Sequence, residues 1–133
     1  MKEIVIDGKN AILGRLASYT AKLALRGNKV VVVNCNEILI TGNPRKTIES
    51  YKEIRSKGGS ILKGPFFPKV PERIVKRTIR GMLPYKQQRG RDALKRVMCH
   101  NEVPDNYKNA SMIKAGREKL IKTISMQKLS GEL

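Results

Sequence analysis

The stretch EIVIDGKNAILGRLASYTAKLALRGNKVVVVN, residues 3–34, decides the fold of this chain. It begins with an aliphatic run, Glu3–Asp7, that is typical of a short strand, and the turn that follows places Asn10 to cap a helix. It ends with a β-branched run, Lys29–Asn34, in which apolar and polar residues do not alternate. Such a run predicts a strand buried on both faces, as in a parallel sheet covered by helices.

Between these two runs lies a segment with the periodicity of a helix. From Ala11 to Arg26, apolar residues recur at spacings of three and four, and Gly27 follows as a stop. Strand, helix and buried strand together make a βαβ unit, whose crossover is expected to be right-handed. The sequence therefore predicts an α/β fold built on a mostly parallel sheet.

The middle of the chain predicts a third strand and two helices. Glu37–Ile40 is typical of a strand or strand edge, and Asn43 followed by Pro44 marks the start of a helix that continues to Arg55. Two prolines and a glycine then indicate an irregular loop over residues 63–68. A second helix is expected to begin at Pro71 and to end near Leu83.

The last third of the chain predicts less regular structure. We expect a basic loop over Tyr85–Arg91, a short helix over Asp92–Met98 and a helix over Ser111–Ile124. Internal repeats and low-complexity segments are absent from the sequence, so residues 1–133 are expected to form one domain.

Positive charge is the feature in which the composition departs most from the norm. Lysine and arginine number 28 against 11 acidic residues, a formal net charge of +17. Such an excess repels itself within a compact fold, and nucleic acid is the commonest polyanion that neutralises it. A membrane partner is not expected, because the longest strongly apolar run, Val30–Val33, is far short of the ~20 residues that span a bilayer. The N-terminal residues also lack the hydrophobic stretch of an export signal.

The basic residues are concentrated in one part of the chain. Residues 1–43 hold six basic and three acidic residues, whereas residues 71–97 hold nine basic and two acidic ones. Within the helix that begins at Pro71, the spacing of Arg73, Arg77 and Arg80 puts them on one face. Lys76 lies beside them. A solvated helix face normally interleaves charges of both signs, so this one predicts a docking surface for anions.

The same sign continues beyond this helix. The glycine between Arg89 and Arg91 is expected to let the backbone approach phosphates. Arg45 and Lys46, in the first turn of the earlier helix, suggest a smaller anion site at its N-terminus. The complete set of candidate RNA-binding residues is Arg15, Arg45, Lys46, Lys63, Lys69, Arg73, Lys76, Arg77, Arg80, Lys86, Arg89, Arg91, Lys95 and Arg96.

Catalysis, cofactor binding and metal binding find little support in the sequence. Residues 42–47 lack the two glycines of a nucleotide-binding P-loop, and residues 8–14 lack the glycine spacing of a dinucleotide fold. His100 is the only histidine, and its neighbour Cys99 is poorly placed for a dyad because adjacent side chains diverge. Cys35 and Cys99 belong to no paired motif and are expected to be reduced and buried. We therefore expect no enzyme, no metal, no cofactor and no small-molecule substrate.

A folded RNA fits the basic segment better than DNA does. Helix-turn-helix, zinc-finger, basic-zipper, RRM and KH patterns are all absent from the sequence. Tyr85 flanks the basic segment and is a candidate for stacking on bases.

Four motifs follow one another along the chain: Asp7-Gly8-x-Asn10-x-Ile12-Leu13-Gly14-Arg15-Leu16-Ala17-Ser18, Gly64-Pro65-Phe66, Pro71-x-Arg73-Ile74 and Arg77-Thr78-Ile79-Arg80-Gly81-Met82-Leu83-Pro84. Together they resemble the universal large-subunit ribosomal protein family L13, in its archaeal and eukaryotic branch. The resemblance covers residues 4–98 and thins after Met98.

Membership of this family would imply a three-layer α/β fold with a mostly parallel four-stranded sheet, flanked by helices and carrying basic loop extensions. It would also imply a place in the cytoplasmic ribosome, binding large-subunit ribosomal RNA beside neighbouring ribosomal proteins and supporting subunit assembly without catalysis. The basic residues of the motifs, with Lys86 just after them, carry this implication to Arg15, Arg73, Arg77, Arg80 and Lys86. Three alternatives stay open at this point: a structural ribosomal protein, a Rossmann-like RNA-modifying enzyme and a regulatory RNA-binding module.

Overall fold

The computed structural model describes residues 2–56, 70–108, 112–114 and 123–132. Its centre is a parallel sheet of four strands in the order β4-β2-β1-β5. These strands are β1 (Glu3–Asp7), β2 (Lys29–Val33), β4 (Val97–Cys99) and β5 (Met112–Lys114). The predicted α/β class with a mostly parallel four-stranded sheet is therefore confirmed.

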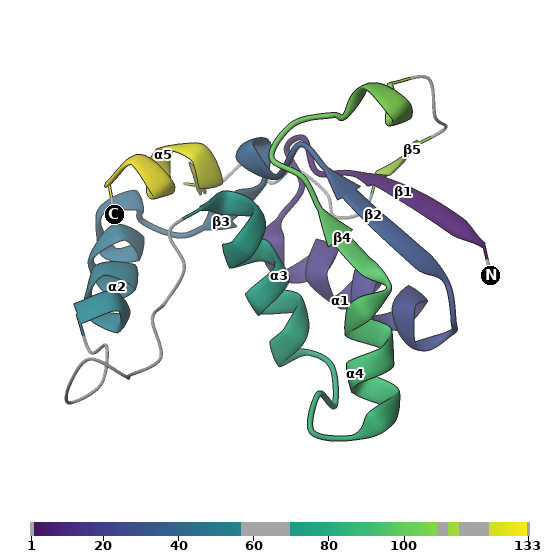
Figure 1. Cartoon of the computed structure of the whole chain (residues 1–133). Helices are drawn as coiled ribbons and strands as arrows, with labels where there is room; N and C mark the ends of the chain where they lie inside the picture. The colour runs from purple at the N-terminus through teal and green to yellow at the C-terminus, as the bar shows by residue number, and fades with distance from the viewer. Residues whose placement is uncertain (1, 57–69, 109–111, 115–122, 133) are drawn as a thin grey trace.

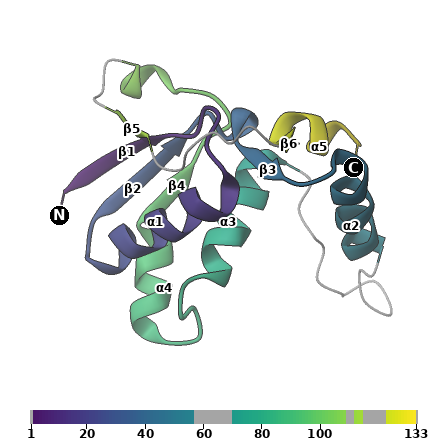
Figure 2. The same ribbon diagram turned by 180° about the vertical axis from the view of Figure 1, so that it is seen from behind.

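Helices cover one face of this sheet. They are α1 (Leu13–Leu25), α3 (Pro71–Gly81) and α4 (Gln88–Lys95), and α1 packs against both of the others. Figures 1 and 2 show the three helices gathered on the same side of β1, β2 and β4. The opposite face carries the segment that follows β4, which includes a 3₁₀ turn at Asp105–Tyr107. The sheet is thus the middle of three layers.

The valine run of β2 explains why the sequence shows no alternation there. Val30 and Val32 belong to the core beneath the helices, whereas Val31 and Val33 pack with Val5 on the other face. All four valines of the strand are fully buried. Both faces of a covered parallel sheet are apolar environments, so every position of its central strand favours an aliphatic side chain.

A second, two-stranded sheet lies at the end of the molecule away from the N-terminus (Figure 1). Strand β3 (Leu39–Thr41) pairs antiparallel with β6 (Thr123–Ser125), and α2 (Pro44–Ser56) and α5 (Met126–Glu132) lie beside this pair. Ile124, Met126 and Leu129 join the main core from this unit. None of the helices in the described residues is long and apolar enough to cross a membrane.

Several sequence predictions of secondary structure need correction. The helix expected over Ser111–Ile124 is wrong, because β5 and β6 occupy the two ends of that range. The unpaired edge of β1 offers backbone partners to residues 112–114, and sheet pairing overrides weak local helix propensity there. The strand expected at Glu37–Ile40 begins two residues late, since Cys35–Glu37 forms a 3₁₀ turn.

The predicted helix cap at Asn10 is also wrong. Helix α1 has Ile12 at its N-cap position without a side-chain cap. Asn10 instead adopts a left-handed conformation with a φ of 60°, and its backbone N–H donates to the carbonyl of Glu37 at 3.1 Å. Asparagine is one of the few side chains that tolerate this conformation, so the residue serves the turn and not the helix.

Candidate nucleic-acid interface

Helix α3 separates apolar from basic side chains. Ile74, Val75 and Ile79 are fully buried in the core. Three arginines of the same helix are exposed and Lys76 is half-buried. The exposed ones are Arg73, Arg77 and Arg80. The apolar spacing fixes the rotation of the helix, and that rotation in turn presents the arginines to solvent.

Three of the four cations of α3 have no carboxylate partner within the described residues. In the described ranges, three ion pairs are defined, joining Lys29 to Glu3, Arg45 to Glu49 and Lys108 to Asp105. None of these pairs lies on α3, and within the same ranges Arg73, Lys76 and Arg80 join no carboxylate. The positive charge of these three residues is therefore available to an external anion.

The turn after α3 joins its last basic residue to an aromatic ring. The guanidinium carbon of Arg80 lies 4.4 Å from the centroid of the Tyr85 ring, a cation–π contact. Backbone hydrogen bonds tighten the turn, from Tyr85 N–H to Leu83 at 2.8 Å and from Gln87 N–H to Pro84 at 2.9 Å. Lys86 is exposed at this turn, which connects α3 directly to α4.

Arg89, Gly90 and Arg91 lie in helix α4, so the basic loop expected over Tyr85–Arg91 is wrong in its second half. Gly90 is buried, and a Cβ built on it would lie 1.9 Å from the carbonyl oxygen of Pro84. The glycine lets α4 pack against the turn, and the prediction that it brings the backbone close to phosphates is wrong. The helix expected over Asp92–Met98 begins earlier, at Gln88, and gives way to β4 at Val97.

The two arginines of α4 are exposed and held by local hydrogen bonds. Arg91 donates to the carbonyl of Lys86 and to Oε1 of Gln88, each at 3.2 Å. Arg89 donates to Oε1 of Gln87 at 3.2 Å. These neutral partners position the guanidiniums near the turn and leave their charge intact. We call residues 73–96, which comprise most of α3, the turn and α4, the basic hairpin.

Arg96 has a structural partner inside the protein. Its Nη1 donates to the carbonyl of Ala24 at 2.9 Å, and the residue is half-buried. This carbonyl lies in the last turn of α1, where helix carbonyls lack partners and a positive charge is favourable. Lys95, in contrast, is exposed.

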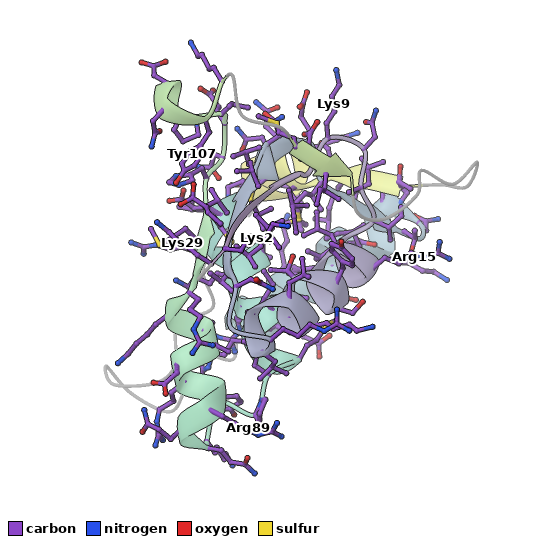
Figure 3. The ribbon with its side chains drawn as sticks, turned by 90° about the vertical axis from the view of Figure 1, so that its right-hand side faces the viewer. Lys2, Lys9, Arg15, Lys29, Arg89 and Tyr107 are labelled. Carbon is purple, nitrogen blue, oxygen red and sulfur yellow. The ribbon has the colours of Figure 1, made fainter. Side chains whose placement is uncertain are left out.

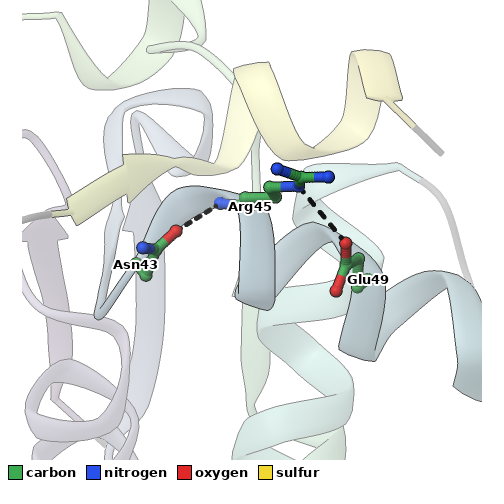
Figure 4. Close-up of polar contacts among 3 residues, drawn as sticks. All are labelled: Asn43, Arg45 and Glu49. Carbon is green, nitrogen blue, oxygen red and sulfur yellow. Dashed lines mark hydrogen bonds and ion pairs between the residues drawn. The ribbon is translucent and has the colours of Figure 1, made fainter.

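The candidate anion site at the start of α2 stands apart from the basic hairpin. Asn43 caps the helix as predicted, accepting a hydrogen bond from the backbone N–H of Arg45 at 3.0 Å. The Nε of Arg45 lies 3.5 Å from a carboxylate oxygen of Glu49, one turn later (Figure 4). Figure 1 shows α2 and α4 at different ends of the molecule, so Arg45 and Lys46 do not join the hairpin. Lys63 and Lys69 lie outside the described residues.

Arg15 is exposed at the start of α1, at the rim of a hollow of about 370 Å³. Figure 3 shows Arg15 and Arg89 projecting from separate parts of the molecule. The hollow is lined mainly by apolar and hydroxyl side chains: Ile12, Leu13, Gly14, Arg15, Ile40, Thr41 and Thr78.

The ends of β1, β2 and β4 form a surface of a different character, which the sequence did not predict. Two shallow hollows of about 450 and 230 Å³ lie there. The side chains that line them include carboxylates and amides, and we call this group the carboxyl edge: Asn34, Asn36, Glu37, Glu72, Asn101 and Glu102. Asn34 donates to the Asp7 carboxylate at 2.9 Å, and Asn101 accepts from the Glu72 backbone N–H at 2.9 Å.

The cysteines lie near this edge. Both are free thiols, Cys35 buried and Cys99 half-buried. A hydrogen bond with Cys99, together with burial, raises the pKa of the Cys35 thiol far above its ordinary value. The described residues contain no group of three or more histidine, cysteine or acidic side chains placed to hold a metal ion.

Comparison with known proteins gives a consistent result. Residues 1–106 match the family described as Ribosomal protein L13. The chain is 47% identical over 110 residues to the large ribosomal subunit protein uL13 of Methanosarcina barkeri, covering 82% of this chain and 78% of that one. The uL13 protein of Archaeoglobus fulgidus is 48% identical over 122 residues, covering 90% and 78%. That of Thermoplasma volcanium is 39% identical over 132 residues, covering 97% and 96%.

Proposed function

Since this chain belongs to the ribosomal protein L13 family, we propose that it is a structural constituent of the large ribosomal subunit that binds ribosomal RNA through the basic hairpin. Its place is then the cytoplasmic ribosome, and its role is to hold RNA and not to catalyse a reaction. The family excludes the RNA-modifying enzyme, one of the three alternatives that the sequence left open.

One observation carries the RNA-binding part of this proposal. The basic hairpin gathers cations along two successive helices that both pack against the core, and within the described residues Arg73, Lys76 and Arg80 join no carboxylate. Phosphate groups neutralise such a surface while releasing their counterions, which makes binding favourable and dependent on salt. We propose the following contacts to RNA: Arg73, Lys76, Arg77, Arg80, Lys86, Arg89, Arg91 and Lys95.

The remaining candidate residues receive different roles in this proposal. Arg96 stabilises the end of α1 through Ala24 and contacts RNA only with its remaining donors. Arg15 lies apart from the hairpin and would reach a separate stretch of the same RNA. Arg45 and Lys46 form a third, outlying contact whose charge is reduced by Glu49. Lys63 and Lys69 stay in the proposal on the basis of the sequence alone.

We further propose that neighbouring large-subunit proteins contact this chain away from the hairpin. The carboxylates of the carboxyl edge repel phosphates, so that part of the surface suits a basic protein segment better than RNA. Binding in this arrangement would support subunit assembly by fixing RNA on one side and protein on the other. Residues 1–133 would act as one domain.

Co-sedimentation tests the proposal. A tagged copy of the chain, expressed in its own host, is expected to sediment with large subunits and to stay there through a high-salt wash. Recovery only outside the ribosome would contradict the proposal and would favour the regulatory RNA-binding module.

A further inference from the structure

Gly81 is a glycine that the fold does not require. It is the last residue of α3, it is exposed, and a Cβ built on it would meet no heavy atom within 4 Å. Its φ lies outside the positive range, which in the described residues only Gly27 and Gly42 adopt among the glycines. Alanine is favoured over glycine in helices by up to about 1 kcal/mol. Neither backbone conformation nor packing therefore requires a glycine at position 81, and what glycine provides there is a surface without a side chain.

Gly90, across the same turn, shows what a required glycine looks like. Its Cβ would collide with the Pro84 carbonyl, so the packing of α4 against the turn excludes any larger residue. The two glycines lie in the same hairpin but differ in their surroundings. Backbone atoms fill the space beside Gly90, whereas the space beside Gly81 is open to solvent. Packing explains Gly90 and cannot explain Gly81.

The open side of Gly81 is part of a small hollow. Its volume is about 160 Å³, and it is lined by Arg77, Arg80, Gly81 and Tyr85. The stacked guanidinium and phenol ring of Arg80 and Tyr85 supply flat surfaces, and the two arginines supply positive charge. A nucleotide combines a flat base with a charged phosphate, so it matches both properties of this hollow.

We propose that this hollow binds one unpaired nucleotide of the ribosomal RNA, with its phosphate at Arg77 and Arg80 and its base stacked on the Arg80–Tyr85 pair over the bare surface of Gly81. This inference rests on the proposed function and specifies one subsite within it. Because every base has a flat face, the subsite accepts a base by stacking and does not select its identity.

Base stacking distinguishes this subsite from the rest of the hairpin, where charge alone is expected to hold the RNA. The other cations of the hairpin contribute to RNA affinity through charge, which salt weakens. Stacking on the Arg80–Tyr85 pair contributes through contact area, so removing the ring while both arginines stay in place lowers affinity and leaves the salt dependence unchanged. A fluorescent base analogue at the bound position would also lose its quenching when the stack is blocked.

The test uses the whole chain and the ribosomal RNA fragment that it protects from nuclease, with 2-aminopurine at each unpaired position in turn. Gly81→Leu fills the hollow and Tyr85→Leu removes the ring. Each is expected to weaken binding by roughly tenfold and to abolish the quenching at one position. Tyr85→Leu keeps both arginines accessible and is expected to leave the salt slope unchanged, whereas Gly81→Leu also displaces the phosphate and is expected to lower the slope by up to about one unit. Gly81→Leu is expected to fold, because the space around it is open.

Gly131→Leu on α5 is the matched control, since Gly131 is also an exposed helical glycine with no atom within 4 Å of its Cβ. Its binding and quenching are expected to equal those of the unmodified chain. If Gly81→Leu also binds and quenches like the unmodified chain while reversal of hairpin charges weakens binding, the nucleotide subsite is wrong and the proposed function stands. If the unmodified chain fails to bind the RNA at low salt, the proposed function itself is wrong.

Discussion

The basic hairpin and the carboxyl edge are two surfaces of opposite character on one small fold. Helix α3 connects them, because Glu72 in its first turn lies at the edge and Arg80 in its last turn lies at the hairpin. At the edge, amides and carboxylates bond to each other and to backbone groups. At the hairpin, the guanidiniums of Arg89 and Arg91 bond to neutral acceptors, which leave their charge uncompensated.

This difference shows that, within the described residues, exposed cations and carboxylates gather on separate parts of the surface. A net charge of +17 that served only for solubility would need no such separation. Under the proposed function, the hairpin would attract phosphates and the carboxylates of the edge would repel them, so an RNA would be oriented as it approaches. The following experiments test how far the two regions differ, in order of expected effect.

Charge reversal on the hairpin is expected to have the largest effect. Arg73→Glu, Arg77→Glu and Arg80→Glu together should lower affinity for the ribosomal RNA fragment by about 100-fold at about 0.1 M salt, and the salt slope by roughly two to three units. The cause is loss of phosphate contacts and new repulsion. The measurement is a binding titration at several salt concentrations.

The carboxyl edge supplies the control for charge reversal. Glu37→Gln with Glu102→Gln should change the same affinity by less than about threefold, since the proposed function places these side chains away from the RNA. Similar losses in both variants would show that the two regions do not differ in function.

Gly90→Ala tests the scaffold of the hairpin without changing its charge. The added methyl group collides with the Pro84 carbonyl and should lower the free energy of unfolding by about 1–3 kcal/mol. Thermal and denaturant unfolding measure this loss, with Gly131→Ala as the control in open space. An unchanged stability would mean that the turn does not pack on α4 as described.

Asn34→Ala tests the scaffold of the carboxyl edge. It removes the hydrogen bond to Asp7 and places alanine at a φ of 57°, so the free energy of unfolding should fall by about 1–2 kcal/mol. RNA affinity of the folded variant should match that of the unmodified chain. A loss of affinity without a loss of stability would place this edge in the RNA interface.

Alkylation of the cysteines near the edge should have the smallest effect on function. Because the pKa of Cys35 is raised, its thiol stays protonated and should react more slowly than Cys99 from pH 7 to about pH 9. The raised pKa also adds stability that is complete below the ordinary thiol pKa and is lost as pH rises above it. Mass spectrometry after timed iodoacetamide treatment gives both rates, and faster reaction of Cys35 would contradict the burial of its thiol.

The fold was predictable wherever burial leaves a direct trace in the sequence. The valine run of β2 and the periodic apolar residues of α1 and α3 each report their surroundings, because a covered sheet and a helix face select aliphatic side chains at fixed spacings. Strand β5 has no such trace. Its three residues become a strand because β1 offers an open edge, which is a property of the assembled sheet.

The candidate site was predictable in outline and not in detail. Spacing alone placed Arg73, Arg77 and Arg80 on one exposed side of a helix. It could not show that Arg96 donates to Ala24, which lies 72 residues away in the chain, because only the folded molecule brings them together. Gly81 and Gly90 are identical letters in the sequence, and only their surroundings separate an open surface from a packing requirement.

Lysine acetylation of the chain, free and bound to the ribosomal RNA fragment, tests the central claim most directly because it needs no substitution. Lys86 and Lys95 report on the basic hairpin. Lys9 reports on the region of the carboxyl edge, because its backbone N–H donates to the Asp7 carboxylate that also accepts from Asn34. If the hairpin holds the RNA, Lys86 and Lys95 lose reactivity on binding while Lys9 keeps it. Protection of Lys9 with continued reaction of Lys86 and Lys95 would contradict the account.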